Sequence, residues 1–421
     1  MGGRDVGINA SRTTLSTVKP PFDRISSLSV MPLSEIAINN ILEQHASQLA
    51  QFKEPDFGGE PPDSGMPGDY LENICDWVAS NPRAIAAAQA SQCTSTAPDI
   101  PNWNTVLFAL VESAAVYLRK DDEIFEAIKA ARSGNISLAV AHIKKSQETI
   151  NEVAESIGCT FVQLCDFSHK GPKGTWVHSG AFCGLFVSKS SEKPFMGVTY
   201  KGTTITNFRE ITTDLDFSLT NPLVQEVAWD AKMHHGFNEG LFGTFNTQQG
   251  AQVAWDVMFN QLVHAYNDHS GERHMLHFTG HSLGGAYCTL TYGEFLRRQN
   301  EVAFANFKFG DMYSLAAPRV CAEPFAEQVN LHTQPKEKKY LFRIVNENDP
   351  IPTVPPRTKS QLQSIPYVHV GGAWELAGSG PRKMPNEPPQ VDPQSIPELF
   401  WNAAHHQVKD YYAHWTSTPH D

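Results

Sequence analysis

A serine flanked by glycines at fixed spacing is the feature of this chain that most directly indicates chemistry. Residues 280–284 read Gly-His-Ser-Leu-Gly, with an apolar segment before them and a helical pattern after them. In such a strand–turn–helix, small flanking residues let the backbones pass while the serine stands on a cramped turn. The helix N-terminus offers N–H groups and a positive dipole end to a developing oxyanion. The pattern therefore predicts Ser282 as the nucleophile of an acyl-transfer reaction.

A serine nucleophile needs a base to take its proton and an acid to orient that base. With this elbow the partners follow in the order serine, acid, histidine. Asp349 comes just after an apolar, strand-like segment, where α/β sheets place their working residues, and Glu347 is the competing carboxylate. The histidines further along the chain are candidate bases: His369, His405, His406, His414 and His420.

The sequence around each histidine makes some of them better candidates for the base than others, but it does not identify a single one. His369 lies in a strand-like segment, which favours a buried, hydrogen-bonded role. His405 and His406 follow a long loop and open a terminal helical segment, where an imidazole can be positioned. The pattern alone does not separate His405 from His406.

A mostly parallel sheet is predicted to hold these residues. From about residue 174, short apolar segments alternate with helical ones. Strands are predicted at 181–187, 195–200, 275–279, 312–315 and 340–345, and helices at 248–268 and 284–298. Strands that alternate with helices indicate an α/β fold with the sheet covered on both faces. The Pro-rich, polar stretch 378–397 predicts a long surface loop.

The first part of the chain has helical patterns in place of alternating strands and helices, and it carries no catalytic motif. Helical patterns are predicted at 34–52, 70–80, 82–91, 103–119, 121–131 and 136–156, with a breaker-rich stretch at 55–69. We therefore expect residues 1–165 to form a largely helical N-terminal extension or cap packed on the core. Residues 166–421 are expected to form the catalytic domain.

Composition and charge exclude some partners. The chain has 421 residues, 41% of them hydrophobic, and a net charge of −12. It lacks the basic stripe that nucleic-acid binding needs, so no nucleic-acid partner is expected. The acidic balance argues against electrostatic docking on anionic membranes but leaves hydrophobic docking open. No apolar run is long enough to span a bilayer.

The sequence lacks a recognisable secretory signal and recognisable metal-ligand motifs, and these two features determine the expected location and cofactors. The N-terminal residues lack the apolar core of a secretory signal, so a cytoplasmic location is expected, with secretion as the alternative if a leader has been removed. The seven cysteines show no C-x-x-C spacing, and the histidines show no recognised ligand pattern. We expect neither a metal nor an organic cofactor.

Ordered blocks around these residues resemble the class 3 lipases, the fungal and plant triacylglycerol lipase family. The resemblance runs from about residue 184 to 415. Its blocks are GVTYKGTTITNFREITTDLDF, HHGFNEGLFG, FTGHSLGGA, YSLAAPRV, and RIVNENDPIPTVPP with the following YVHVGGAWEL. Lys201 stands where the family has Arg, and Leu315-Ala316-Ala317 replaces its F-G pattern. The resemblance implies an α/β-hydrolase fold.

The resemblance also implies roles for individual residues. Ser282 matches the nucleophile and Asp349 the acid. His406, followed by Tyr411, fits the base best, and His405 remains the alternative. The oxyanion hole would consist of Thr203 and Leu283. The amphipathic segment after Thr203 resembles the lid, whose apolar, substrate-facing residues would be Ile205, Phe208 and Ile211.

Together these features predict a serine carboxylic-ester hydrolase that works through an acyl-enzyme. The family points to a lipase that cleaves acylglycerols or other long-chain esters, in transient contact with a lipid interface. The alternatives are a phospholipase, a short-chain or feruloyl-type esterase and, outside enzymes, a pseudo-hydrolase that binds lipids.

Overall fold

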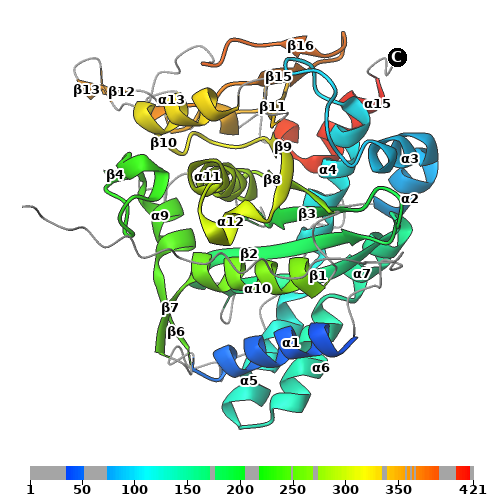
Figure 1. Ribbon diagram of the computed structural model, residues 1–421, viewed down its shortest axis with the longest axis vertical. Coiled ribbons are helices and arrows are strands. Elements are labelled where there is room, and N and C mark those ends of the chain that lie inside the picture. Colours follow the sequence, from blue (N-terminus) through cyan, green and yellow to red (C-terminus); the bar gives the residue numbers. More distant parts are fainter. Residues whose placement is uncertain are drawn as a thin grey trace, which may run out of the picture.

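An eight-stranded sheet forms the centre of the computed structural model (Figure 1), in the order β1-β2-β3-β8-β9-β11-β15-β16. Neighbours from β3 to β15 are parallel, and the pairs at both edges are antiparallel. The predicted mostly parallel sheet is therefore confirmed. The strands are β1 (Cys159–Lys170), β2 (Trp176–Ser188), β3 (Phe195–Tyr200), β8 (Met275–His281), β9 (Lys308–Leu315), β11 (Leu341–Asn346), β15 (Ala373–Leu376) and β16 (Arg382–Lys383).

The structure describes most of the chain, with gaps. The described residues are 35–51, 74–170, 176–203, 218–247, 250–268, 274–333, 339–355, 358–360, 363–364, 367–387 and 404–417. Among them are three smaller sheets, built from β14-β10-β5-β4, β12-β13 and β6-β7. Their strands are β4 (Leu219–Thr220), β5 (Met233–His234), β6 (Thr244–Thr247), β7 (Gly250–Val253), β10 (Cys321–Ala322), β12 (Thr358–Ser360), β13 (Gln363–Ser364) and β14 (Tyr367–Val368).

Helices cover both faces of the central sheet, because its strands are apolar on both sides. Phe161 and Val162 are successive residues of β1 and belong to two different cores. One core lies under α9 (His235–Phe242), α10 (Ala254–Asp268), α11 (Leu283–Arg298), α12 (Val302–Ala305) and α13 (Glu323–His332). The other lies under α2 (Ile74–Ser80), α3 (Pro82–Ala90), α4 (Trp103–Ala115), α7 (Glu148–Ser156) and α15 (Val408–Thr416). Strand β8 is central, with α4 against one face and α11 against the other.

The remaining helices of the N-terminal part build a third, smaller core. It consists of α1 (Glu35–Leu49), α5 (Asp121–Arg132) and α6 (Ile136–Ser146), which lie together at the lower end of the molecule (Figure 1). The predicted single helix over 136–156 is wrong. It divides into α6 and α7 at Gln147, whose side chain donates to Gln163 on β1 at 2.5 Å.

Some other sequence expectations need correction or stay open. Strand β1 begins at Cys159, so the sheet starts inside the segment expected to be helical, and a division of the chain at residue 165 stays a prediction. The β6-β7 hairpin delays the helix predicted from residue 248 until Ala254. The stretches 1–34 and 52–73 lie outside the described residues, as does the part of the predicted surface loop after residue 387.

Candidate active site

Ser282 occupies the sharp turn between β8 and α11. Its backbone has φ 59° and ψ −128°, a conformation that costs a non-glycine residue about 1–3 kcal/mol and persists only where the surroundings enforce it. Its N–H donates to Leu315 O at 3.0 Å on the neighbouring strand. A Cβ on Gly280 would overlap Gly284 O, and one on Gly284 would overlap Tyr200 O. Both flanking glycines are therefore required by close backbone contacts.

The same contacts place the two residues expected to form the oxyanion hole, Thr203 and Leu283, where the end of β3 meets the start of α11. Because Gly284 packs on Tyr200 O, the end of β3 runs beside the start of α11, and Thr203 is the third residue after β3. Leu283 is the first residue of α11, so its N–H has no acceptor within the helix. Lys201, the departure from the family pattern, is buried, with Nζ 3.5 Å from Gly202 O. The expected lid residues Ile205, Phe208 and Ile211 lie outside the described residues.

Asp349 and His406 form a buried carboxylate–imidazole pair. His406 Nδ1 lies 3.0 Å from Asp349 Oδ1 and 2.9 Å from Oδ2. The carboxylate also accepts the N–H of Ile351 at 2.9 Å and the hydroxyl of Tyr411 at 2.6 Å. Burial, reinforced by the charge of Asp349, raises the pKa of Tyr411 well above its ordinary value, so the phenol stays a donor. A carboxylate can only accept, which assigns the proton to Nδ1 and makes Nε2 the basic nitrogen.

The competing residues have other partners. His405 Nδ1 contacts Asp410 Oδ2 at 3.0 Å, and its ring is part-exposed. The ring of His369 is buried and contacts Pro352 O at 2.6 Å, and burial with the nearby Arg343 and Arg319 lowers its pKa well below the ordinary value. Neither histidine ring is bonded to Asp349, and His420 lies outside the described residues. Glu347 is half-buried on the same loop, and it is Asp349 that meets the imidazole of His406.

The nucleophile turn and the segment that carries His406 are in direct contact. His281, which precedes Ser282, has Nε2 2.9 Å from His406 O, and the two rings are 4.7 Å apart. Sequence patterns did not identify this contact, because the second residue of the G-x-S-x-G pattern is unspecified. The described structure thus brings together the elements that bear Ser282, Asp349, His406, Thr203 and Leu283.

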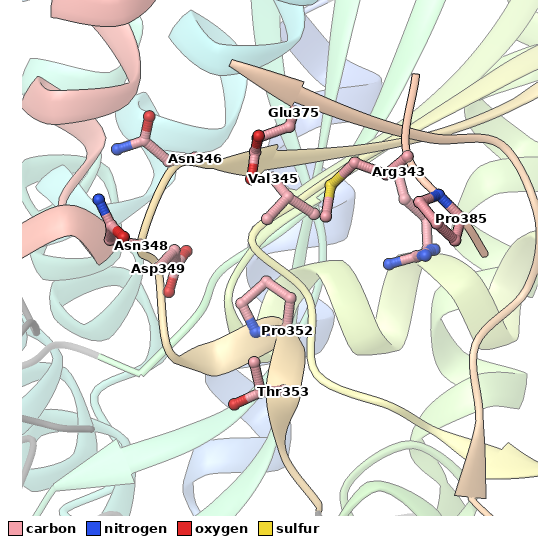
Figure 2. A pocket seen from close by; sticks show the side chains of 10 residues that line it. Arg343, Val345, Asn346, Asn348, Asp349, Pro352, Thr353, Glu375 and Pro385 are labelled. Atoms are coloured by element: carbon pink, nitrogen blue, oxygen red, sulfur yellow. The ribbon is translucent and has the colours of Figure 1, made fainter. Parts of the chain in front are cut away.

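A cavity of about 180 Å³ lies behind the loop that carries Asp349 (Figure 2). Its walls come from β11, the loop after it, β15 and the segment at 384–385. They include Arg343, Val345, Asn346, Asn348, Asp349, Pro352, Thr353, Glu375, Met384 and Pro385. Ser282 and His406 do not line it. The cavity therefore borders Asp349 without including the other two candidate catalytic residues.

Within the described ranges, no cluster of His, Cys, Asp or Glu has an arrangement that could hold a metal ion. All seven cysteines are free, and only Cys75 is exposed. No helix of the described part of the chain is long and apolar enough to cross a membrane.

Comparison with known proteins finds a family over part of the chain. Residues 197–359, which span β3, the nucleophile turn and the loop with Asp349, match the family described as lipase (class 3). Solved structures also align. Lipase II from Rhizopus niveus is 19% identical, with a TM-score of 0.40, over 63% of this chain and 79% of the other. A lipase from Rhizopus microsporus var. chinensis is 19% identical, with a TM-score of 0.38, over 74% and 87%. These TM-scores are low, and the assignment rests on the matched segment.

Proposed function

We propose that this chain, whose residues 197–359 match the class 3 lipase family, is a serine carboxylic-ester hydrolase. The family implies a lipase-type α/β-hydrolase acting on lipid or ester substrates. The finer proposal assigns Ser282 as nucleophile, His406 as base and Asp349 as the acid that orients it. The observation that carries it is the buried contact of both Asp349 oxygens with His406 Nδ1, beside the strained turn at Ser282.

The reaction follows from the roles of these groups. His406 Nε2 accepts the proton of Ser282 as its Oγ attacks the ester carbonyl, and Asp349 stabilises the imidazolium through Nδ1–H. The backbone N–H groups of Leu283 and Thr203 stabilise the oxyanion, at about 3 kcal/mol per donor. When the intermediate collapses, the imidazolium gives its proton to the departing alcohol and leaves an acyl-enzyme. Water, deprotonated by the same histidine, then releases the carboxylic acid and restores the serine.

Acylglycerols and other long-chain esters are the proposed substrates. The proposal rests on the family match and on the amphipathic sequence with Ile205, Phe208 and Ile211, proposed as a lid that makes transient contact with lipid. Phospholipids and short-chain or feruloyl esters use the same chemistry and are the alternative substrates. A pseudo-hydrolase that binds lipid without cleaving it is the alternative outside enzymes.

A series of p-nitrophenyl esters from acetate to palmitate tests the proposal, with rates measured below and above the substrate's aggregation threshold. We expect the purified chain to prefer long acyl chains and its rate to rise when the substrate aggregates. Preference for short chains with saturation in solution would identify an esterase instead.

The control is Ser282→Ala, which keeps the turn and removes the nucleophile. We expect its hydrolysis to fall to background while binding to triacylglycerol emulsions persists. Hydrolysis by Ser282→Ala at the wild-type rate would refute the assignment of the nucleophile. A wild-type protein that binds emulsions and cleaves none of the esters would support the pseudo-hydrolase.

A further inference from the structure

The main chain around His406 is held by two buried side chains from the elements that carry the other two proposed catalytic residues. His281, at the end of β8, contacts His406 O at 2.9 Å. Asn346, at the end of β11, donates from Nδ2 to His405 O at 2.9 Å. Two consecutive main-chain carbonyls are thus hydrogen-bonded. His406 O is bonded to the residue before Ser282, and His405 O is bonded to the strand that leads to Asp349. Figure 2 shows Asn346 and Asp349 at the same end of β11.

The hydrogen bonds of His281 define its protonation state. A carbonyl oxygen only accepts, so the contact with His406 O requires a proton on Nε2. The other nitrogen, Nδ1, lies 3.0 Å from the hydroxyl of Tyr117, which can donate to it and which also lies 3.3 Å from the carbonyl oxygen of His281. Burial, with His406 close by, lowers the pKa of His281 well below its ordinary value, so the ring stays neutral. The ring therefore accepts from Tyr117 and donates to His406 O.

We propose that His281 is a positioning residue that fixes the main chain of His406, and that Tyr117 supports the tautomer in which it does so by donating to Nδ1. The inference rests on the proposed function, since it assigns His406 as the base. His281 connects the nucleophile turn directly to the residue that carries the base. Tyr117 belongs to the 3₁₀ turn Val116–Leu118 after α4, so the N-terminal helical part supplies a residue that supports the site.

The physical reason is that proton transfer depends steeply on geometry. Displacement of a reacting group by about 1 Å can cost roughly a hundredfold in rate. Among the described residues, bonds at His405 O, His406 O and His406 Nδ1 help to position the base. Loss of the His281 donor removes the bond at His406 O.

Three substitutions at His281 separate positioning from packing. His281→Gln keeps an N–H at about the reach of Nε2, so we expect kcat within about fivefold of the wild type. His281→Asn can meet Tyr117 but does not reach His406 O, and His281→Leu does neither. For Asn and Leu we expect kcat to fall about 10–100-fold, the usual size for loss of a supporting hydrogen bond at a site. KM should stay within about twofold, because the buried ring of His281 makes its hydrogen bonds to protein groups.

Tyr117→Phe gives a second, gentler test, because it removes a single hydroxyl. We expect kcat to fall about three- to tenfold in the wild-type background and to stay unchanged in the His281→Leu background. This non-additivity is expected because both changes act through the same contact with His406 O. The control is His274→Leu, which removes a buried histidine at the opposite end of β8 and should leave kcat unchanged. Thermal unfolding of every variant monitors folding.

The outcomes distinguish this inference from the proposed function. Background activity in the wild type would refute the proposed function. Wild-type activity with unchanged kcat in His281→Leu would refute the inference alone. Equal losses in His281→Gln and His281→Leu would assign His281 a packing role, and so would additive effects with Tyr117→Phe. If the His281 variants do not fold, an unchanged kcat in Tyr117→Phe refutes the role of Tyr117, and a fall in kcat supports it.

Discussion

Tyr411 bridges the acid and the strand that positions it. Its hydroxyl donates to Asp349 Oδ2 at 2.6 Å and accepts the N–H of Asn346 at 2.9 Å. A buried carboxylate oxygen needs hydrogen-bond donors, because it has lost those of water. Tyr411 therefore satisfies Asp349 and links its orientation to the end of β11.

Tyr411→Phe is predicted to lower kcat about tenfold and to reduce the free energy of unfolding by about 1.5–3 kcal/mol, as expected for loss of a hydrogen bond to a charged group. Ester hydrolysis and urea unfolding are the measurements. Tyr412→Phe is the matched control, since the neighbouring hydroxyl accepts from Asn81 at 2.9 Å and its ring stacks on Trp77, away from Asp349. Equal effects of the two substitutions would contradict the role of Tyr411.

The two adjacent histidines are predicted to differ sharply in function. His406→Ala removes the proposed base and should lower kcat by roughly 10⁴-fold or more. His405→Ala removes a part-exposed ring paired with Asp410 and should change kcat by less than about threefold. Steady-state hydrolysis of one soluble ester by both variants makes the comparison. A larger loss for His405→Ala would reverse the assignment.

Asp311 is predicted to make stability depend on pH. Burial raises its pKa to about 7 from an ordinary 3.8, although the N–H groups of Ser95 and Tyr340 donate to it. Because the folded state holds this proton more tightly, the contribution of Asp311 to the free energy of unfolding is largest below about pH 4 and is lost as pH rises to about 7. The contribution is on the order of a few kcal/mol. Urea unfolding between pH 4 and 8 measures it, and Asp311→Asn should flatten this part of the curve; an unchanged slope would contradict the prediction.

Removal of residues 1–165 is predicted to leave insoluble protein. Helix α4 packs on β8, and its Glu112 contacts His277 at 2.6 Å, with both side chains fully buried. Deletion would expose one face of the sheet, leave a buried imidazole without its partner and remove part of β1. Solubility of the fragment and of the full chain, produced in parallel, is the measurement. A soluble, fully active fragment would show that the N-terminal part is dispensable.

Secondary-structure elements were predicted best where a few neighbouring residues determine the local structure. Strand β3 has the bounds predicted for it, and the Gly-His-Ser-Leu-Gly pattern lies at a strand–helix turn as expected. Strand β1 was not predicted, although Gly158, at φ 65°, lies at the turn between α7 and this strand. The break at Gln147 depends on a contact with Gln163, which periodicity does not encode.

The supporting contacts of the site could not be predicted at all. Tyr117 and His281 are 164 positions apart, and Asn346 and His405 are 59 apart. Such pairs have no characteristic spacing, since they meet only after the sheet has formed. By contrast, Asp349 could be proposed from its place after a strand, and His406 from the family resemblance. The structure adds the contact between them.

The order of the functional elements along the chain has a consequence for biosynthesis. Ser282 and Asp349 precede His406 in the chain, and His406 meets Asp349 just before α15, which packs against α4. Chains are synthesised from the N-terminus, so a nascent polypeptide carries its proposed nucleophile and acid before it has the proposed base. The proposed hydrolytic activity would therefore begin only after this last segment has emerged and packed.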